Sequence, residues 1–196
     1  MKNIKIYRKV VPIILIILCP LSLFSGVDLY KIDSTHSSIE FSIRHFVAKT
    51  NGNFSNFEGF IEYNEDNLND NYAEAKIYIS SVDTNNQKRD SHLQESDYFN
   101  SSANPIIEFK STNWKKDDKD NQFIVEGNLI MNGVGNPVSL NVTLLGVGEG
   151  FDGQQLSGWE GTTSLDRTDW NILGGIGPVG ENVDIRINIE AVKQDN

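Results

Sequence analysis

Strict alternation of apolar and polar side chains over residues 37–45 most constrains what this chain can fold into. On one face the side chains are apolar up to a terminal histidine: Ile39, Phe41, Ile43 and His45. A period of two predicts a β-strand with one buried face. If this strand lines a closed sheet, the interior of the sheet is apolar and has one titratable group near its end.

The same alternation recurs in short segments separated by Asn, Asp and Gly. The predicted strands cover residues 29–32, 37–45, 54–63, 72–82, 105–114, 123–131, 138–146, 156–165 and 183–192, with Asn-Gly turns at 51–52 and 132–133. Residues 85–95 lack the period and predict one short helix. Amphipathic strands joined by tight turns predict an all-β, antiparallel protein, either a barrel or a sandwich. An eight-stranded barrel would have room for packed side chains or for one slender ligand.

The first residues have the composition of an export signal. Four basic residues, Lys2, Lys5, Arg8 and Lys9, precede an apolar stretch over residues 10–24, and small residues follow at 25 and 26. We expect residues 1–26 to be a signal peptide and residues 27–196 to form one domain, periplasmic or secreted. An uncleaved membrane anchor is the alternative, but this stretch, interrupted by Pro12 and Pro20, is short for a span of roughly 20 residues.

Charge and cysteine content narrow the partners. The chain has 17 basic and 27 acidic residues, and removal of the basic leader would leave it more acidic still. Without a basic stripe to meet phosphates, we expect no nucleic acid, and adsorption to anionic lipid is disfavoured. The single cysteine, Cys19, lies in the leader, so the exported domain has no disulfide. Leu18 stands where a lipoprotein signal has a small residue, so lipidation is not expected.

Few residues predict catalysis or metal binding. The three histidines, His36, His45 and His92, lack the close spacing of a zinc site, so we expect no metal. No Gly-x-Ser-x-Gly elbow is present, and we expect no catalytic residues. Residues 175–180 match the letters of a dinucleotide fingerprint, but no helix follows to bind a pyrophosphate, so they predict a loop at the rim. Residues 166–170 predict a turn held by its own charges.

His45 and residues 89–93 each have two interpretations. His45 is either a hydrogen-bonded structural histidine at the core edge or a polar partner for a ligand head at the end of an apolar channel. Residues 89–93 are either a solvated helix with an Arg–Asp pair above a leucine or a polar lid over one mouth of the barrel.

Several short motifs, in order along the chain, resemble those of the YceI-like family of exported bacterial proteins. They are SSIEFSIRH (37–45), GNF (52–54) with FEG (57–59), SVDT (81–84), RDSHL (89–93), DYF (97–99), PIIEFKST (105–112), GNL (127–129) with MNG (131–133), and DRTDWN (166–171). The resemblance spans essentially the whole exported part. Tyr98 and Asn171 depart from the Phe and Gly usual in the family, which concerns the packing of the rim.

The resemblance implies an extended eight-stranded antiparallel lipocalin-like barrel, often dimeric, in the periplasm or outside the cell. Its long apolar pore would bind a polyisoprenoid, such as an isoprenoid quinone or a polyprenyl phosphate, for transport or storage. It implies no enzymatic activity and no cofactor besides the bound lipid, and it is compatible with a transient membrane contact. Burial of each CH₂ contributes roughly 0.8 kcal/mol, so an apolar pore can hold such a chain without a strong polar anchor.

From the alternation of faces we expect the walls of this pore to be Ile39, Phe41, Ile43, Ile77, Ile79, Phe109, Leu129, Leu140, Val142, Ile185 and Ile187. His45, with His92 or Arg89 from the lid, would meet the head group. Two alternatives stay open. One is an enzyme acting on a lipid-like substrate with His45 as general base, and the other is a stress-related interaction protein whose barrel is filled by its own side chains.

Overall fold

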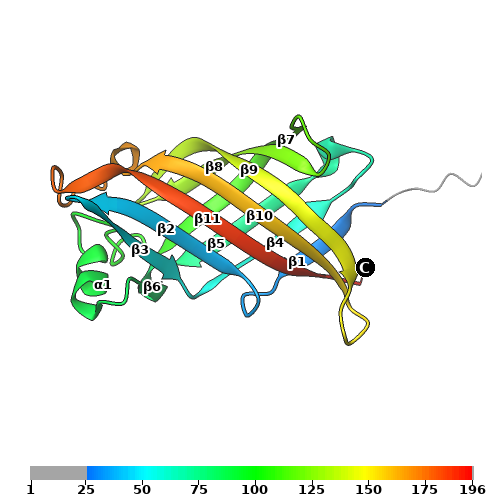
Figure 1. Cartoon of the computed structure of the whole chain (residues 1–196), viewed down its shortest axis with the longest axis horizontal. Coiled ribbons are helices and arrows are strands. Elements are labelled where there is room, and N and C mark those ends of the chain that lie inside the picture. Colours follow the sequence, from blue (N-terminus) through cyan, green and yellow to red (C-terminus); the bar gives the residue numbers. More distant parts are fainter. Residues whose placement is uncertain (1–25, 196) are drawn as a thin grey trace, which may run out of the picture.

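Eight antiparallel strands close into a ring in the computed structural model, which describes residues 26–195 (Figure 1). The sheet order is β1-β4-β5-β7-β8-β9-β10-β11, and a further pairing of β1 with β11 closes it. These strands are β1 (Asp28–Ile32), β4 (Phe57–Tyr63), β5 (Tyr72–Tyr78), β7 (Ile106–Lys116), β8 (Gln122–Met131), β9 (Val134–Glu149), β10 (Gln155–Asp166) and β11 (Val179–Lys193). The predicted all-β fold is confirmed, and it is the barrel rather than the sandwich.

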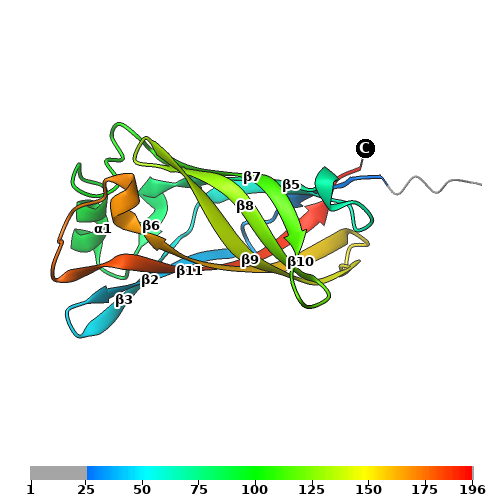
Figure 2. The same ribbon diagram turned by 90° about the horizontal axis from the view of Figure 1, so that it is seen from above.

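Three further strands lengthen the wall at one end of the barrel: β2 (Ser38–His45), β3 (Ala48–Phe54) and β6 (Val82–Asp83). This extension arises because β11 changes partner along its length. Its residues 179–188 pair with β2, and its residues 191–193 pair with β1. The single α-helix of the described chain, α1 (Gln87–Leu93), lies at the extended end, as the sequence predicted for residues 85–95 (Figure 2).

The alternation seen in the sequence sorts side chains between the interior and the outside of the barrel. Ile39 of β2 is opposite Ile187 of β11, and both are apolar neighbours on the inner face. The outward positions carry charge, with Glu40 directly opposite Arg186. An apolar cross-strand pair on one face and opposite charges on the other both stabilise this register.

One of the two predicted turns is wrong. Asn51 and Gly52 lie inside β3, where Gly52 pairs with Phe41. A Cβ atom at position 52 would overlap the Phe41 ring, so glycine is used here for close approach and not for a turn. The hairpin turn between β2 and β3 falls instead at Phe46 and Val47. The predicted turn at Asn132 and Gly133 is confirmed, and both residues have positive φ angles.

Short 3₁₀ segments interrupt the chain between strands: Leu68–Asp70, Ile79–Ser81 and Arg167–Trp170. The second of these ends the strand predicted over residues 72–82, so β5 stops at Tyr78. The predicted signal peptide covers residues 1–26, and all of it except residue 26 lies outside the described residues. Among the described residues, no helix is both long and apolar enough to span a membrane.

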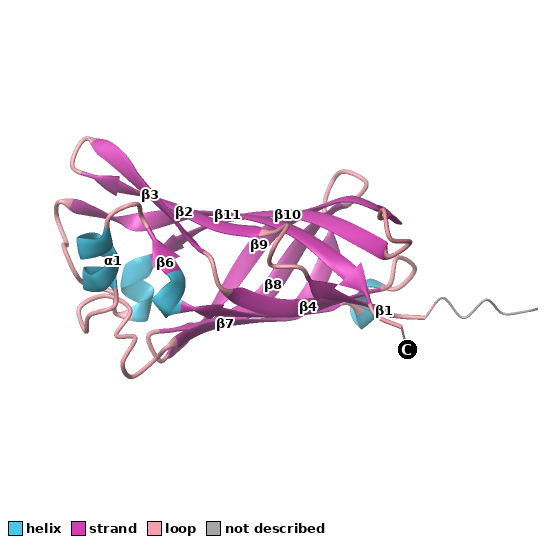
Figure 3. Ribbon diagram, turned by 90° about the horizontal axis from the view of Figure 1, so that it is seen from below, coloured by secondary structure: helices cyan, strands magenta, loops and turns pink. Residues whose placement is uncertain are grey.

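An aromatic cluster fills the interior at one end of the barrel. Five large aromatic side chains pack together there, and we call them the aromatic plug: Tyr30, Tyr63, Trp114, Phe123 and Trp159. Figure 3 shows β1 and the carboxy terminus at one end, and α1 with the β2–β3 hairpin at the other. The plug lies at the end with β1. The two ends of the molecule therefore differ, with packed aromatic rings inside one and α1 at the other.

Candidate functional site

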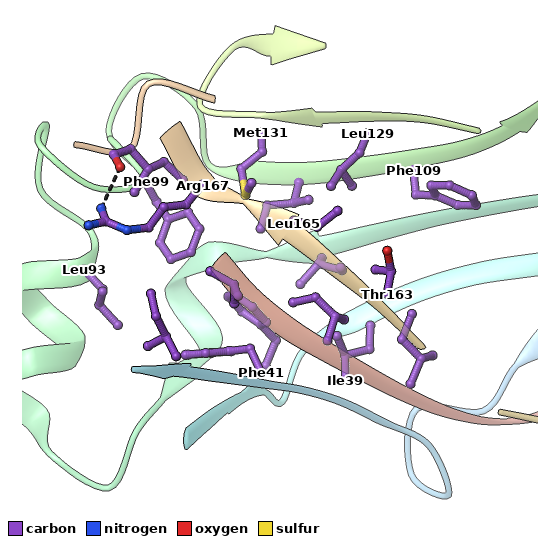
Figure 4. A pocket seen from close by; sticks show the side chains of 18 of the residues that line it. Ile39, Phe41, Leu93, Phe99, Phe109, Leu129, Met131, Thr163, Leu165 and Arg167 are labelled. Carbon is purple, nitrogen blue, oxygen red and sulfur yellow. Dashed lines mark hydrogen bonds between the residues drawn. The ribbon is translucent and has the colours of Figure 1, made fainter. Parts of the chain in front are cut away.

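An apolar cavity of about 620 Å³ occupies the barrel between α1 and the aromatic plug. Ile39 and Phe41 rise from one wall, and Leu129 and Met131 descend from the opposite wall (Figure 4). Several inward side chains, such as Ile43 and Ile185, are only half-buried. Their uncovered surface faces the cavity, because their strands turn this face away from solvent. The barrel is therefore hollow over this part of its length.

The aromatic plug closes the far end of the cavity. The Tyr63 and Trp159 ring centroids are 5.1 Å apart with the rings edge to face, and Trp114 and Phe123 are 5.8 Å apart in a similar arrangement. Trp159 Nε1 donates to Ser157 Oγ at 3.0 Å, which satisfies the one polar atom of that buried indole. The expected pore is thus closed at one end by the plug, and α1 lies at the other end.

The structure gathers all of the predicted contact residues around this cavity except Ile79 and Val142. Ile79 is fully buried because it sits in a 3₁₀ turn, which breaks the strand period and directs its side chain into the protein core. Val142 has the predicted inward direction, but it lies too deep and packs against the aromatic plug. The predicted positions of these two residues are wrong. Ligand contact by the others stays a prediction.

Sequence reasoning missed several lining residues: Leu93, Tyr98, Phe99, Met131, Leu165 and Ile172. Met131 and Leu165 continue the alternation of β8 and β10, so extending the same pattern by one step would have found them. Leu93, Tyr98 and Phe99 come from α1 and the loop after it, where no period indicates which side faces the cavity.

Polar and basic groups collect at the open end of the cavity, in an otherwise acidic protein. His45, Lys88, Arg89 and His92 all line this end. His45 is exposed at the end of β2, so burial in the core does not account for it. Its ring meets Phe46 edge to face at 4.9 Å.

Helix α1 is fastened to the barrel through Thr84. Arg89 Nε donates to Thr84 Oγ1 at 2.7 Å, and Arg89 Nη2 donates to the Thr84 carbonyl at 2.6 Å. Asp90 accepts from the Thr84 N–H at 2.9 Å. The predicted Arg–Asp pair is therefore replaced by a bridge in which both side chains bind the same buried threonine. This bridge holds α1 over the end of the barrel where the cavity opens.

Arg167 is buried beside the cavity and fixes a loop. Its Nε donates to the Gly180 carbonyl at 2.8 Å and its Nη1 to the Ile172 carbonyl at 2.6 Å. Arg167 is therefore held by carbonyl groups, and the prediction that the turn's own charges hold it is wrong for this residue. Asp166 does bond within the turn, accepting from the Thr168 N–H at 3.0 Å and from Thr168 Oγ1 at 2.7 Å. The remaining Arg167 atom, Nη2, has no partner and almost no accessible surface. That atom is not accessible from the cavity, although Arg167 is among the residues that line it.

A separate cluster of titratable groups lies outside the cavity. His36 Nδ1 is 2.8 Å from Asp33 Oδ2 and 3.6 Å from Glu190 Oε1. The Asp33 carboxylate raises the pKa of His36, mainly through this hydrogen bond, and His36 in turn lowers the pKa of Asp33. These three groups are also close enough to hold an ion. The short bond already occupies Nδ1, so a surface ion pair accounts for the arrangement.

A closed antiparallel barrel around a blind apolar cavity defines a class of protein that encloses an apolar small molecule. Comparison with known proteins gives the family. A model of the YceI-like domain matches residues 30–191. A UPF0312 protein of Photorhabdus laumondii is 36% identical over 168 residues, covering 84% of this chain and 86% of that protein. The protein YceI of Escherichia coli is 35% identical over 168 residues, covering 84% and 87%. The chain belongs to the YceI-like family.

Solved structures agree on the fold. Burkholderia cenocepacia BcnA superposes with a TM-score of 0.75 at 19% identity, over 82% of this chain and 99% of that chain. A Campylobacter jejuni YceI protein gives 0.70 at 24% identity, over 76% and 88%. A polyisoprenoid binding domain from Saccharophagus degradans, implicated in plant cell wall breakdown, gives 0.68 at 13% identity, over 84% and 98%.

Proposed function

We propose that this protein binds one isoprenoid lipid in its cavity and carries or stores it in the periplasm or outside the cell. The observation that carries the proposal is the cavity itself, about 620 Å³ and lined mainly by aliphatic and aromatic side chains. Its volume falls within the roughly 300–1,000 Å³ of ordinary ligand sites. The Saccharophagus degradans protein of similar fold is a polyisoprenoid binding domain, which supports the same ligand class here.

The asymmetry of the cavity gives the ligand a direction. The aromatic plug closes one end, and the basic groups Lys88 and Arg89 lie at the other. A lipid would enter tail first and leave its oxygen-bearing head near α1. A quinone carbonyl or a phosphate would both accept hydrogen bonds there, so an isoprenoid quinone and a polyprenyl phosphate are the two candidates.

The enzyme alternative has less support. It requires His45 in a deep, water-poor pocket beside a carboxylate. His45 is instead exposed at the mouth, with the Phe46 ring as its aromatic neighbour. The observed environment suits a contact to a ligand head better than proton transfer within the barrel.

Native mass spectrometry of the purified protein, followed by extraction and identification of any lipid, tests the proposal. We expect a single isoprenoid bound per chain. The double variant Ile43→Trp, Ile187→Trp places two indoles in the cavity and should lose this lipid. Ile130→Trp is the matched control, because Ile130 is exposed and does not line the cavity. Unchanged lipid content in the folded double variant, or no lipid in the wild type, would contradict the proposed function.

A further inference from the structure

We propose that the mouth of the barrel docks on a zwitterionic lipid bilayer through four exposed apolar side chains. We call them the apolar rim: Phe46, Val47, Leu173 and Ile176. The inference rests on the proposed function and deepens it, since it assigns the surface through which the lipid would enter and leave. Large exposed apolar groups gathered on one surface mark contacts with membranes or proteins.

The apolar rim comes from two loops that are joined to each other. Phe46 N–H donates to the Pro178 carbonyl at 2.7 Å, which ties the β2–β3 turn to the loop before β11. Val179 pairs with His45 just beyond this bond. Figures 1 and 3 both show these two loops at the same end of the barrel as α1. The four side chains therefore belong to one surface.

This surface is continuous with the open end of the cavity. His45 and Val179 line the cavity, and each is within three residues of a member of the apolar rim. Phe46 and Ile176 themselves do not line it. An isoprenoid chain passing between the cavity and a bilayer would thus cross apolar groups, provided that the rim touches the membrane. Transfer by this route avoids exposing the chain to water.

The turn that presents Phe46 and Val47 is unfavourable for the folded chain alone. The first residue of a two-residue hairpin turn has a positive φ angle, which favours Gly, Asn or Asp at that position. Phe46 has a φ of 49°, a conformation that bulky side chains rarely adopt. Its side chain is nevertheless 62% exposed, and that of Val47 is fully exposed. The contact of Phe46 with the His45 ring leaves most of this apolar surface uncovered, so an external apolar contact is the better explanation.

Charge determines which kind of bilayer fits. The whole chain has a net charge of −10, so an anionic membrane surface would repel it. Next to the rim, Lys49 is already paired with Asp184 at 2.8 Å. Basic groups do lie at the mouth, among them Lys88 and the exposed Arg44, whose Nη1 donates to the Phe46 carbonyl at 3.0 Å. They are few against the net negative charge of the chain, so the contact would depend on apolar insertion more than on attraction to acidic head groups. A phosphatidylcholine surface meets both conditions.

The test uses the double variant Phe46→Asn, Val47→Gly. It places Asn, which tolerates a positive φ, at position 46 and removes the apolar side chain at position 47, so the hairpin should be as stable as before while half of the apolar rim is removed. Phe151→Asn is the matched control, because Phe151 is fully exposed on the β9–β10 loop at the opposite end of the barrel. The full chain is expressed so that any processing occurs, and the intact mass of each purified product is recorded.

Flotation with phosphatidylcholine vesicles measures the contact, and native mass spectrometry measures bound lipid in the same samples. We expect the wild type and Phe151→Asn to float equally. The double variant should bind the vesicles at least about tenfold more weakly, as expected when one large apolar side chain is no longer buried. Its bound lipid before mixing should be unchanged.

Three outcomes would overturn the docking surface. They are a wild type that carries lipid but does not float, an equal loss in Phe151→Asn, and binding that requires anionic vesicles. If the double variant instead turns a dimer into a monomer without any vesicle binding by the wild type, the rim is a contact between copies of the chain and the proposal is wrong. If the purified wild type carries no lipid, that result counts against the proposed function. Native mass spectrometry measures the lipid content independently of flotation.

Discussion

At the scale of single residues, two glycines determine how aromatic rings lie along the cavity wall. A Cβ atom at Gly52 would overlap the Phe41 ring, and one at Gly127 would overlap the Phe109 ring. Each ring therefore lies over a glycine of the neighbouring strand, where it takes up less of the cavity. A larger residue at either glycine would push the ring into the space proposed for the lipid.

Gly52→Ala should accordingly lower the free energy of unfolding by about 1–3 kcal/mol, the usual cost of overpacking. It should also reduce the amount of bound lipid, because the displaced Phe41 ring enters the cavity. Urea denaturation and native mass spectrometry measure the two effects. Gly146→Ala is the control, since nothing lies within 4 Å of a Cβ added there. Equal stability of the two variants would show that the Phe41 ring can move at no cost.

At the scale of elements, the passage from β1 to β2 decides how the barrel is extended, because both strands pair with β11. The corner between them is joined to β11 by several bonds. Asp33 N–H donates to the Glu190 carbonyl at 2.9 Å, and Glu190 N–H donates to Ser37 Oγ at 3.0 Å. The ion pair of His36 with Asp33 lies over the same corner.

This corner should make stability depend on pH. The pKa of His36 is raised, so its contribution is fully present below the unfolded value of about 6.5 and is lost as pH rises through the higher folded pKa. The pKa of Asp33 is lowered, so its share is lost as pH falls through that lower folded pKa. The difference in melting temperature between wild type and His36→Gln should shrink as pH is raised from about 6 to about 9. A difference that is constant over this range would contradict the assignment.

At the scale of the whole molecule, the barrel combines a solid end and a hollow end. The aromatic plug supplies a packed core that does not depend on a ligand. Around the cavity, by contrast, inward apolar side chains such as Ile43 and Ile187 stay half-exposed. A lipid in the cavity would cover this surface, and it would therefore bind the native state and not the unfolded chain.

Removal of the lipid should lower the stability of the protein. A ligand present at about 100 times its dissociation constant contributes about 2.7 kcal/mol, which corresponds to a fall of roughly 5–10 °C in melting temperature for a domain of this size. Calorimetry before and after solvent extraction, with the lipid then added back, measures the shift and its reversal. An unchanged melting temperature after complete extraction would show that the cavity is stable when empty.

The faces of the strands could be predicted from the sequence, but positions along the barrel could not. Ile39, Phe41 and Ile187 line the cavity as their alternation indicated. Val142 has the correct face, but it lies beside the plug because strand register places it deeper. Ile79 leaves the pattern because a 3₁₀ turn replaces the strand. Local periodicity indicates which face of the sheet a side chain is on. It does not give the position of the side chain along the barrel, nor the places where a 3₁₀ turn interrupts the strand.

The sequence by itself determined that the strands are amphipathic and antiparallel and that their apolar faces meet. Many short segments with a period of two each have one apolar face, and these faces are removed from water by packing against one another. Alternation did not decide between a barrel and a sandwich, and the barrel was implied only by the family resemblance. Tertiary structure alone decided that one end is plugged, and that Phe46 and Val47 form the exposed turn where Asn51 and Gly52 were expected. These features depend on which strands become neighbours and in what register. Neighbours distant in sequence, such as β1 and β11, leave no local signal of their pairing.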